Sequence, residues 1–184
     1  MKRENVRIHE TAEVSDEASI GEGTNIWHQA QVRENAIIGS GCNIGKGVYI
    51  DFDVVLGDRV KIQNYVSVYH GVKIGNDVFL GPHCVFTNDL YPRAAISDFK
   101  VTETLVEDGA SICTNATIIC GNRIGRYAMI GAGSVVTKDV PDHALVFGNP
   151  ARIKGFVCKM GHKMERFEDS KYRCNVCDEE IIID

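Results

Sequence analysis

Every sixth residue from Ile8 to Phe86 is a bulky apolar residue, without a break. The chain is 44% apolar, so fourteen successive apolar residues at this spacing would arise by chance with a probability of about one in a hundred thousand. The period resumes from Val106 to Val136 after an interruption over residues 87–105. A six-residue period fits neither a helix stripe nor an alternating strand, and it is typical of a parallel β-helix.

Each hexad predicts one side of a triangular coil. We expect its first residue and its small or β-branched fifth residue to point inward, as for Ile44 and Val48. Glycine often follows the apolar residue, and we expect it to relieve the strain of the turn. Three sides close a coil of eighteen residues, so positions eighteen apart should stack at about 4.8 Å. Residues from about 88 to 105 interrupt the period and carry Pro92, so they should loop out from one corner.

The composition limits the classes of partner and the cellular location that we expect for this chain. The net charge is −5 with mixed signs, and the absence of a basic stripe argues against nucleic acid. No apolar run approaches the ~20 residues of a membrane span. Four of the seven cysteines lie inside hexads, where a thiol behaves as a small apolar group, so we expect no disulfide framework and a cytoplasmic location.

Longer strings carry a family resemblance: IWH (26–28), IQNYVSVYHGVKIGNDVFLGPHCVFTND (62–89), PRA (92–94) and IGRYAMIGAGSVVTKDVPDHALVFGNPARIKGFVC (124–158). The chain resembles the hexapeptide-repeat acyltransferases, and most narrowly the bacterial N-acetyltransferases of UDP-2-acetamido-3-amino-2,3-dideoxy-glucuronate. The resemblance implies an all-β, left-handed parallel β-helix over residues 1–148 and a C-terminal cap and tail over 149–184. It also implies acetyl-CoA as co-substrate, a nucleotide-sugar partner and a homotrimer with active sites between subunits.

Two residues are candidates for catalysis. His70 and Asn88 are eighteen apart and should be neighbours on one corner. An imidazole is suited to take a proton near neutral pH, which makes His70 the candidate general base. Relatives commonly carry an acidic residue at this position, so either the identity of the base or the identity of the sugar stays open. Asn88 could orient the amine or the thioester carbonyl. The alternative roles are an ordinary turn histidine and a turn-forming asparagine.

Further polar and aromatic residues are candidates for holding the substrate. His28, Lys46 and Asn64 should stack on a second corner. Arg93, in the interruption, could pair with a sugar carboxylate or a diphosphate, or remain a solvated loop residue. The substrate-binding set is Trp27, His28, Gln63, Asn64, Tyr65 and Arg93.

The acetyl-CoA groove is expected along the later coils, where small residues stack and leave room for a pantetheine arm. The family strings imply adenine and phosphate contacts, with Lys138 and Arg152 suited to phosphate charge. The cofactor-binding set is Ala110, Ala128, Gly131, Ala132, Lys138, Asn149, Pro150, Ala151 and Arg152.

The tail carries Cys158, His162, Cys174 and Cys177, in the pattern C-x3-H-x11-C-x2-C. This spacing predicts a zinc-ribbon-like tail with a structural zinc, because four protein ligands leave no open position for chemistry. The alternative is a tail with unliganded thiols.

The leading functional hypothesis is an acetyl-CoA-dependent N-acetyltransferase acting on a nucleotide-linked amino sugar, for surface polysaccharide synthesis. An O-acetyltransferase of a sugar or of serine would need a histidine–acid pair to activate a hydroxyl. A zinc carbonic anhydrase would need three converging histidines, yet His70 and His83 are thirteen apart. A non-catalytic solenoid that binds partners on its flat faces is the remaining alternative.

Overall fold

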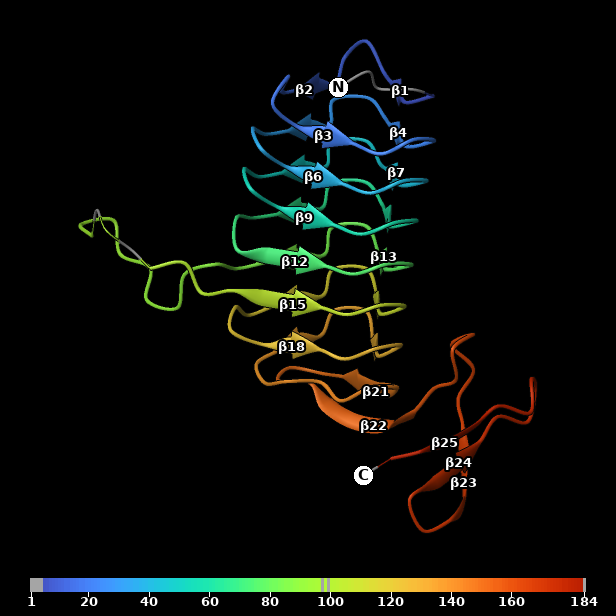
Figure 1. Ribbon diagram of the computed structural model, residues 1–184. Helices are drawn as coiled ribbons and strands as arrows, with labels where there is room; N and C mark the ends of the chain where they lie inside the picture. The colour runs from blue at the N-terminus through green and yellow to red at the C-terminus, as the bar shows by residue number, and fades with distance from the viewer. Residues whose placement is uncertain (1–4, 97, 99, 184) are drawn as a thin grey trace.

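The chain is a parallel β-solenoid. The computed structural model describes residues 5–96, 98 and 100–183. Only β-strands, and no helices, occur in this part of the chain. Each coil gives one short strand to each of three sheets, which stack into a column (Figure 1). Because the described residues contain no helix, none of them forms a helix that could cross a membrane.

Three sheets form the faces of the column, and their strands are parallel except for the last strand of the first sheet. The first sheet contains β1 (Arg7–Ile8), β4 (Asn25–Ile26), β7 (Asn43–Ile44), β10 (Lys61–Ile62), β13 (Phe79–Leu80), β16 (Ser111–Ile112), β19 (Met129–Ile130), β21 (Ala144–Phe147) and β22 (Arg152–Phe156). The second contains β2 (Glu13–Val14), β5 (Gln31–Val32), β8 (Tyr49–Ile50), β11 (Ser67–Val68), β14 (Val85–Phe86), β17 (Thr117–Ile118) and β20 (Val135–Val136). The third contains β3 (Ser19–Ile20), β6 (Ile37–Ile38), β9 (Val55–Leu56), β12 (Val72–Ile74), β15 (Thr104–Val106) and β18 (Arg123–Ile124).

The strand register confirms the eighteen-residue coil. Asn43 pairs with Asn25 on one side and with Lys61 on the other. Across the interruption the register changes, and Phe79 pairs with Ser111. The extra residues leave the column between β14 and β15 as a long projecting loop (Figure 1), as the sequence predicts.

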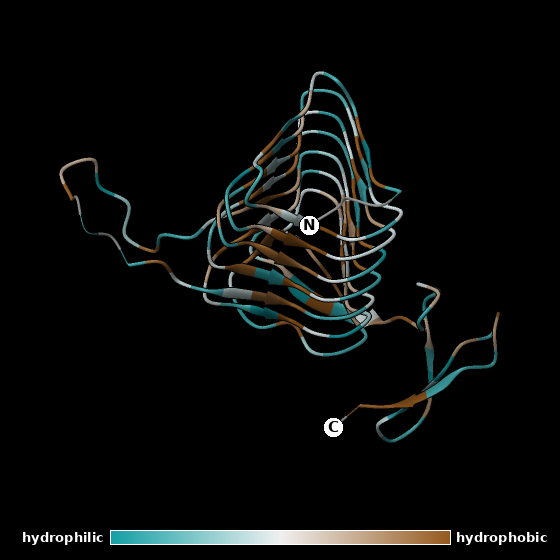
Figure 2. Ribbon diagram, turned by 45° about the horizontal axis from the view of Figure 1, so that its top comes forward, coloured by the Kyte–Doolittle hydropathy of each residue, from teal (hydrophilic) through white to brown (hydrophobic). Residues whose placement is uncertain are grey.

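The core is a single apolar column inside the triangular coils, whose outline is visible in Figure 2. First and fifth residues of the hexads point inward as predicted, so that Ile44 and Val48 are 0% and 1% exposed. Thiols take the same positions: burial raises the pKa of Cys84 to about 12, which keeps it a neutral packing group.

The glycines that follow the apolar residues have a different reason from the one expected. The left-handed turn conformation falls on the fourth residue of the hexad, such as Asn35 with φ 56°. The second residue is glycine because the next coil lies too close for a side chain. A Cβ on Gly39 would lie 2.5 Å from Oδ1 of Asp58, which accepts a hydrogen bond from the Ser40 N–H at 2.8 Å. Gly45, Gly57, Gly75 and Gly125 make room for a side-chain oxygen in the same way, whereas a Cβ on Gly21 or Gly81 would meet the backbone of the next coil.

The C-terminal end departs from the coil pattern. Strand β22 runs antiparallel to β21, so residues 152–156 pair with the end of the solenoid. The tail then forms a separate antiparallel sheet of β23 (Glu165–Glu168), β24 (Lys171–Arg173) and β25 (Glu180–Ile182). Its buried cluster contains only Cys158, Met164 and Cys174 among the described residues.

Candidate active site

His70 lies on the corner between β11 and β12, where the projecting loop also begins. Its ring stacks on Phe52 with centroids 4.2 Å apart, and its Nδ1 lies 3.0 Å from the Phe52 carbonyl oxygen. A carbonyl oxygen can only accept a hydrogen bond, so Nδ1 carries the proton in this contact. The neutral ring then has its lone pair on Nε2, in a side chain that is 27% exposed. This is the arrangement that a general base needs.

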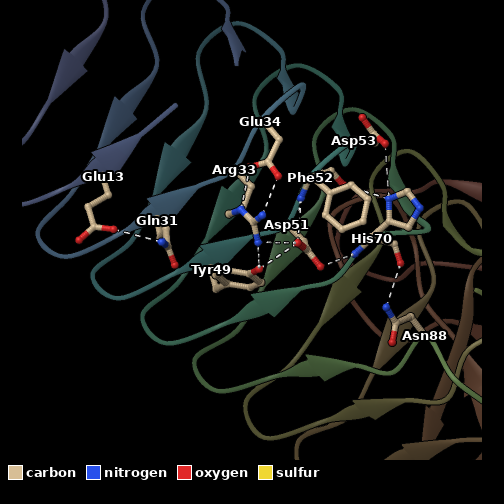
Figure 3. A network of polar contacts seen from close by, with 10 residues as sticks. All are labelled: Glu13, Gln31, Arg33, Glu34, Tyr49, Asp51, Phe52, Asp53, His70 and Asn88. Atoms are coloured by element: carbon tan, nitrogen blue, oxygen red, sulfur yellow. Dashed lines mark hydrogen bonds and ion pairs between the residues drawn. The ribbon is translucent and has the colours of Figure 1, made fainter. Parts of the chain in front are cut away.

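Asn88 lies next to His70, as eighteen-residue stacking predicts. Its Nδ2 donates to the His70 carbonyl oxygen at 3.3 Å (Figure 3). The side-chain amide is therefore held beside the imidazole, at the point where the chain leaves the column.

Asp51 is a further residue of this corner, and the sequence pattern did not predict a role for it. It is 7% exposed, and its carboxylate accepts hydrogen bonds from Tyr49 Oη at 2.8 Å, from the Phe52 N–H at 2.9 Å and from the His70 N–H at 3.2 Å. Figure 3 shows it between the Tyr49 ring and the His70 corner. Asp53 is a second acid at this corner, with Oδ2 3.9 Å from His70 Nδ1. The sequence does place Phe52 eighteen residues before His70, and this spacing could have indicated that Asp51 and Asp53 lie beside the imidazole.

Arg33, Glu34 and Tyr49 extend this network along the corner. Arg33 bonds to both carboxylate oxygens of Glu34, at 2.8 and 2.6 Å, and to Tyr49 Oη at 3.2 Å. The hydrogen bond from Arg33 lowers the pKa of Glu34, so the pair stays ionised and mutually neutralised. Burial raises the pKa of Tyr49 and the hydrogen bond to Asp51 acts in the same direction, which keeps the phenol a donor.

Most of the predicted substrate-binding residues gather on a different corner. Trp27, His28, Gln63 and Asn64 line a groove of about 300 Å³. Trp27 Nε1 donates to Asn43 Oδ1 at 2.8 Å, which fixes the indole at the edge of that groove. This corner follows the first sheet, whereas His70 follows the second, so one chain does not bring the two groups together.

Two further residues of this set lie outside the groove. Tyr65 stacks on His83, with ring centroids 5.3 Å apart. Arg93 is exposed on the projecting loop and donates to the carbonyl of its neighbour Pro92 at 2.8 Å. The structure therefore does not place Arg93 against either corner.

The residues predicted to bind acetyl-CoA divide into three groups. Lys138, Ala151 and Arg152 line one groove of about 250 Å³ at the C-terminal end of the solenoid. Ala132, Asn149 and Pro150 are exposed, and Gly131 is partly buried. Ala110 and Ala128 are fully buried fifth residues of their hexads, so their side chains do not reach the surface. Their small size was expected to let a pantetheine arm approach the backbone, and that expectation stays a prediction.

The tail brings its four predicted metal ligands together. Their donor atoms all lie within 4.8 Å of one another, and His162 Nδ1 is 3.5 Å from Cys158 Sγ and 3.7 Å from Cys174 Sγ. A tetrahedral zinc with bonds of about 2.3 Å to sulfur and about 2.0 Å to nitrogen would put these atoms about 3.6 Å apart. Burial raises the pKa of Cys174, but hydrogen bonds from the Val176 and Cys177 N–H groups outweigh it and leave the pKa at about 6. The donor set therefore fits a zinc ion.

No other group of three or more histidine, cysteine or acidic ligands converges in the part of the chain that the structure describes.

A family model matches part of the chain. The model described as bacterial transferase hexapeptide (six repeats) matches residues 17–51 and 53–88. These residues are therefore hexapeptide repeats of the bacterial transferase type. The coiled, all-strand architecture is that of the left-handed β-helix expected for such repeats.

Individual relatives match this chain over parts of their length. The dTDP-3-amino-3,6-dideoxy-alpha-D-galactopyranose 3-N-acetyltransferase of Aneurinibacillus thermoaerophilus is 58% identical over 71 residues, which are 39% of this chain and 36% of the relative. The galactoside O-acetyltransferase of Lactococcus lactis is 35% identical over 88 residues, which are 44% of this chain and 41% of the relative. The chain thus spans less than half the length of either curated relative.

A solved structure extends the comparison over most of the chain. A mutant of perosamine N-acetyltransferase from Caulobacter crescentus, in complex with CoA and GDP-perosamine, superposes with a TM-score of 0.52 at 27% identity. The match covers 82% of this chain and 56% of that one.

Proposed function

We propose that this protein is an acetyl-CoA-dependent N-acetyltransferase that acts on the amino group of a nucleotide-linked amino sugar. The observation that carries the proposal is the His70 imidazole, which has Nδ1 engaged by the Phe52 carbonyl and Nε2 left as an acceptor beside Asn88. The relatives named above support the substrate class, because two of them are N-acetyltransferases of amino sugars carried on a nucleotide.

The reaction would be nucleophilic attack by the sugar amine on the thioester carbonyl of acetyl-CoA. His70 Nε2 takes the proton that the nitrogen loses as the new C–N bond forms, and the protonated imidazole can return it to the departing CoA thiolate. The Asn88 amide is positioned to orient the amine or the carbonyl by hydrogen bonding. Holding both substrates on a rigid corner supplies much of the rate, because it makes their encounter intramolecular.

Acetyl-CoA is proposed to lie along the later coils and to place phosphate charge near Lys138 and Arg152, which share a groove with Ala151. We also propose a homotrimer. The support is that the His70 corner and the Trp27 groove lie on separate corners of one chain, so a neighbouring copy is needed to bring such groups across a shared cleft.

The tail is proposed to bind one structural zinc through Cys158, His162, Cys174 and Cys177. The tail has only a small buried cluster. So few apolar side chains rarely stabilise a fold without a metal or another cross-link, which supports a zinc ion here. A cytoplasmic location is part of the same proposal, because reducing conditions keep thiolates free to bind metal.

The test is release of free CoA thiol by the purified full chain against a panel of sugar nucleotides. The panel holds UDP- and dTDP-linked 3-amino sugars, a GDP-linked 4-amino sugar, and matched compounds with a hydroxyl in place of the amine. Turnover confined to the amino sugars is the expected result. Turnover of the hydroxyl compounds alone would favour the O-acetyltransferase alternative, for which the galactoside O-acetyltransferase is a relative. No turnover together with no CoA binding would favour a non-catalytic solenoid.

A further inference from the structure

At the His70 corner, side-chain acceptors bridge the coils in the opposite direction from those at several neighbouring corners. On several coils of the other two corners, the third residue of the hexad is an aspartate or asparagine whose Oδ1 reaches back to the preceding coil. Asp58 Oδ1 accepts the Ser40 N–H at 2.8 Å, and Asn64 Oδ1 accepts the Lys46 N–H at 3.0 Å. The third residue at these corners is therefore occupied with holding the coils together.

On the His70 corner the acceptor comes from the preceding coil instead. Asp51 Oδ2 accepts the His70 N–H at 3.2 Å, and on a later coil of the same corner Thr87 Oγ1 accepts the Cys120 N–H at 2.9 Å. Asp51 and Thr87 are second residues of their hexads, the position that holds glycine at many other corners. This reversal releases the third residue from its structural task, and on three successive coils of this corner the third residues are Phe52, His70 and Asn88.

Asp51 also fixes the group that orients the imidazole. Its Oδ1 accepts the Phe52 N–H at 2.9 Å, and the carbonyl of the same Phe52 lies 3.0 Å from His70 Nδ1. One carboxylate thus holds both the backbone of His70 and the residue whose carbonyl accepts the hydrogen bond from its Nδ1–H. A charged group with only 7% of its surface exposed is costly unless it is well hydrogen-bonded, and Tyr49 Oη at 2.8 Å and Arg33 Nη1 at 3.7 Å complete its shell.

We propose that Asp51 is a positioning residue for the transferase reaction: it locks His70 in the tautomer that leaves Nε2 as the base. The proposal deepens the proposed function and depends on it for its kinetic consequences. Asp53, whose Oδ2 is 3.9 Å from His70 Nδ1, is the competing candidate for this role, but its carboxylate is half exposed and has no bond to the His70 backbone among the described contacts. Glu34 faces Arg33 with both oxygens and is not available to the imidazole.

Asp51→Asn is the test variant. The amide keeps the shape and one acceptor oxygen, but its NH2 group would meet the His70 N–H donor to donor. The matched control is Asp58→Asn, at a corner with no contact to the site. Two readouts are needed: steady-state kinetics, and the ¹⁵N spectrum of the full chain labelled at histidine, with the His70 signals assigned from a His70→Asn sample.

We expect the wild-type spectrum to show His70 mainly protonated at Nδ1, and Asp51→Asn to shift it toward the Nε2-protonated form. We expect kcat to fall on the order of tenfold to a hundredfold, with the KM for acetyl-CoA unchanged. Asp58→Asn should leave both readouts as in the wild type. An unchanged tautomer and an unchanged kcat in Asp51→Asn would overturn the proposal, as would an equal effect of the control. Because the spectrum needs no substrate, a tautomer shift in a chain without acetyl transfer would refute the proposed function but retain the positioning role.

Discussion

Oδ1 of Asn76 lies 2.7 Å from the point where a Cβ on Gly57 would stand, and the same oxygen accepts the Asp58 N–H at 2.8 Å. The two residues belong to successive coils, nineteen positions apart. The same relationship joins Gly39 to Asp58, Gly45 to Asn64 and Gly75 to Asp108. At these four positions, glycine in the second position of a hexad is therefore coupled to an aspartate or asparagine in the third position of the next coil.

Gly57→Ala should destabilise the solenoid by about 2 kcal/mol, because the new methyl group meets both Asn76 Oδ1 and the Gly75 backbone. The matched control is Gly133→Ala, where a Cβ would meet nothing within 4 Å and the cost is about 1 kcal/mol for the left-handed φ of 68°. Urea unfolding of the two variants measures the difference. Equal losses in the two variants would contradict the coupling.

The six-residue period predicts the coil, the inward residues and the neighbours on each corner. It correctly pairs His70 with Asn88 and His83 with Tyr65, because stacking follows from coil length alone. It does not reveal which side-chain oxygens accept hydrogen bonds across coils, since the apolar pattern records only which side chains point inward. The role of Asp51 was missed for this reason.

The period also indicates which residues of the predicted cofactor site carry side chains at the surface. Ala110 and Ala128 are small residues on one line, but they occupy fifth positions, which the same pattern sends into the core. Lys138 occupies a third position, which points outward, and it does line a groove. The position in the hexad is therefore a better guide to a binding surface than residue size.

Asn88→Ala should lower kcat on the order of tenfold to a hundredfold while acetyl-CoA binding is retained, because the variant loses an orienting amide and no phosphate contact. Asn25→Ala is the control, since its side chain makes a similar hydrogen bond to a carbonyl, that of Gly23, in the first coils. Steady-state kinetics and CoA binding by calorimetry separate the two effects. Unchanged turnover in Asn88→Ala would remove this residue from the mechanism.

His70→Asn should lower the rate on the order of a hundredfold near neutral pH, and the deficit should shrink as the pH rises. The reason is that the sugar amine loses its proton to solvent at high pH and then needs no base. His83→Asn serves as the control, because His83 stacks on Tyr65 at a different corner. The measurement is kcat/KM from low to high pH for both variants. A ratio of variant to wild type that stays flat across pH would count against His70 as the base.

Zinc removal should loosen the tail and leave the coils intact. The tail has a separate sheet and a buried cluster in which two of the three buried residues are proposed metal ligands, whereas the solenoid has its own continuous core. Elemental analysis of the purified chain should find about one zinc, and Cys174→Ser should lose it, with Cys113→Ser as the control outside the tail. Hydrogen exchange should then rise in residues 158–183 and stay low in the coils.

Zinc affinity should also fall as the pH drops, because protons compete for the Cys174 thiolate, whose pKa is about 6. A chain purified without zinc whose tail is already protected from exchange would contradict the metal site.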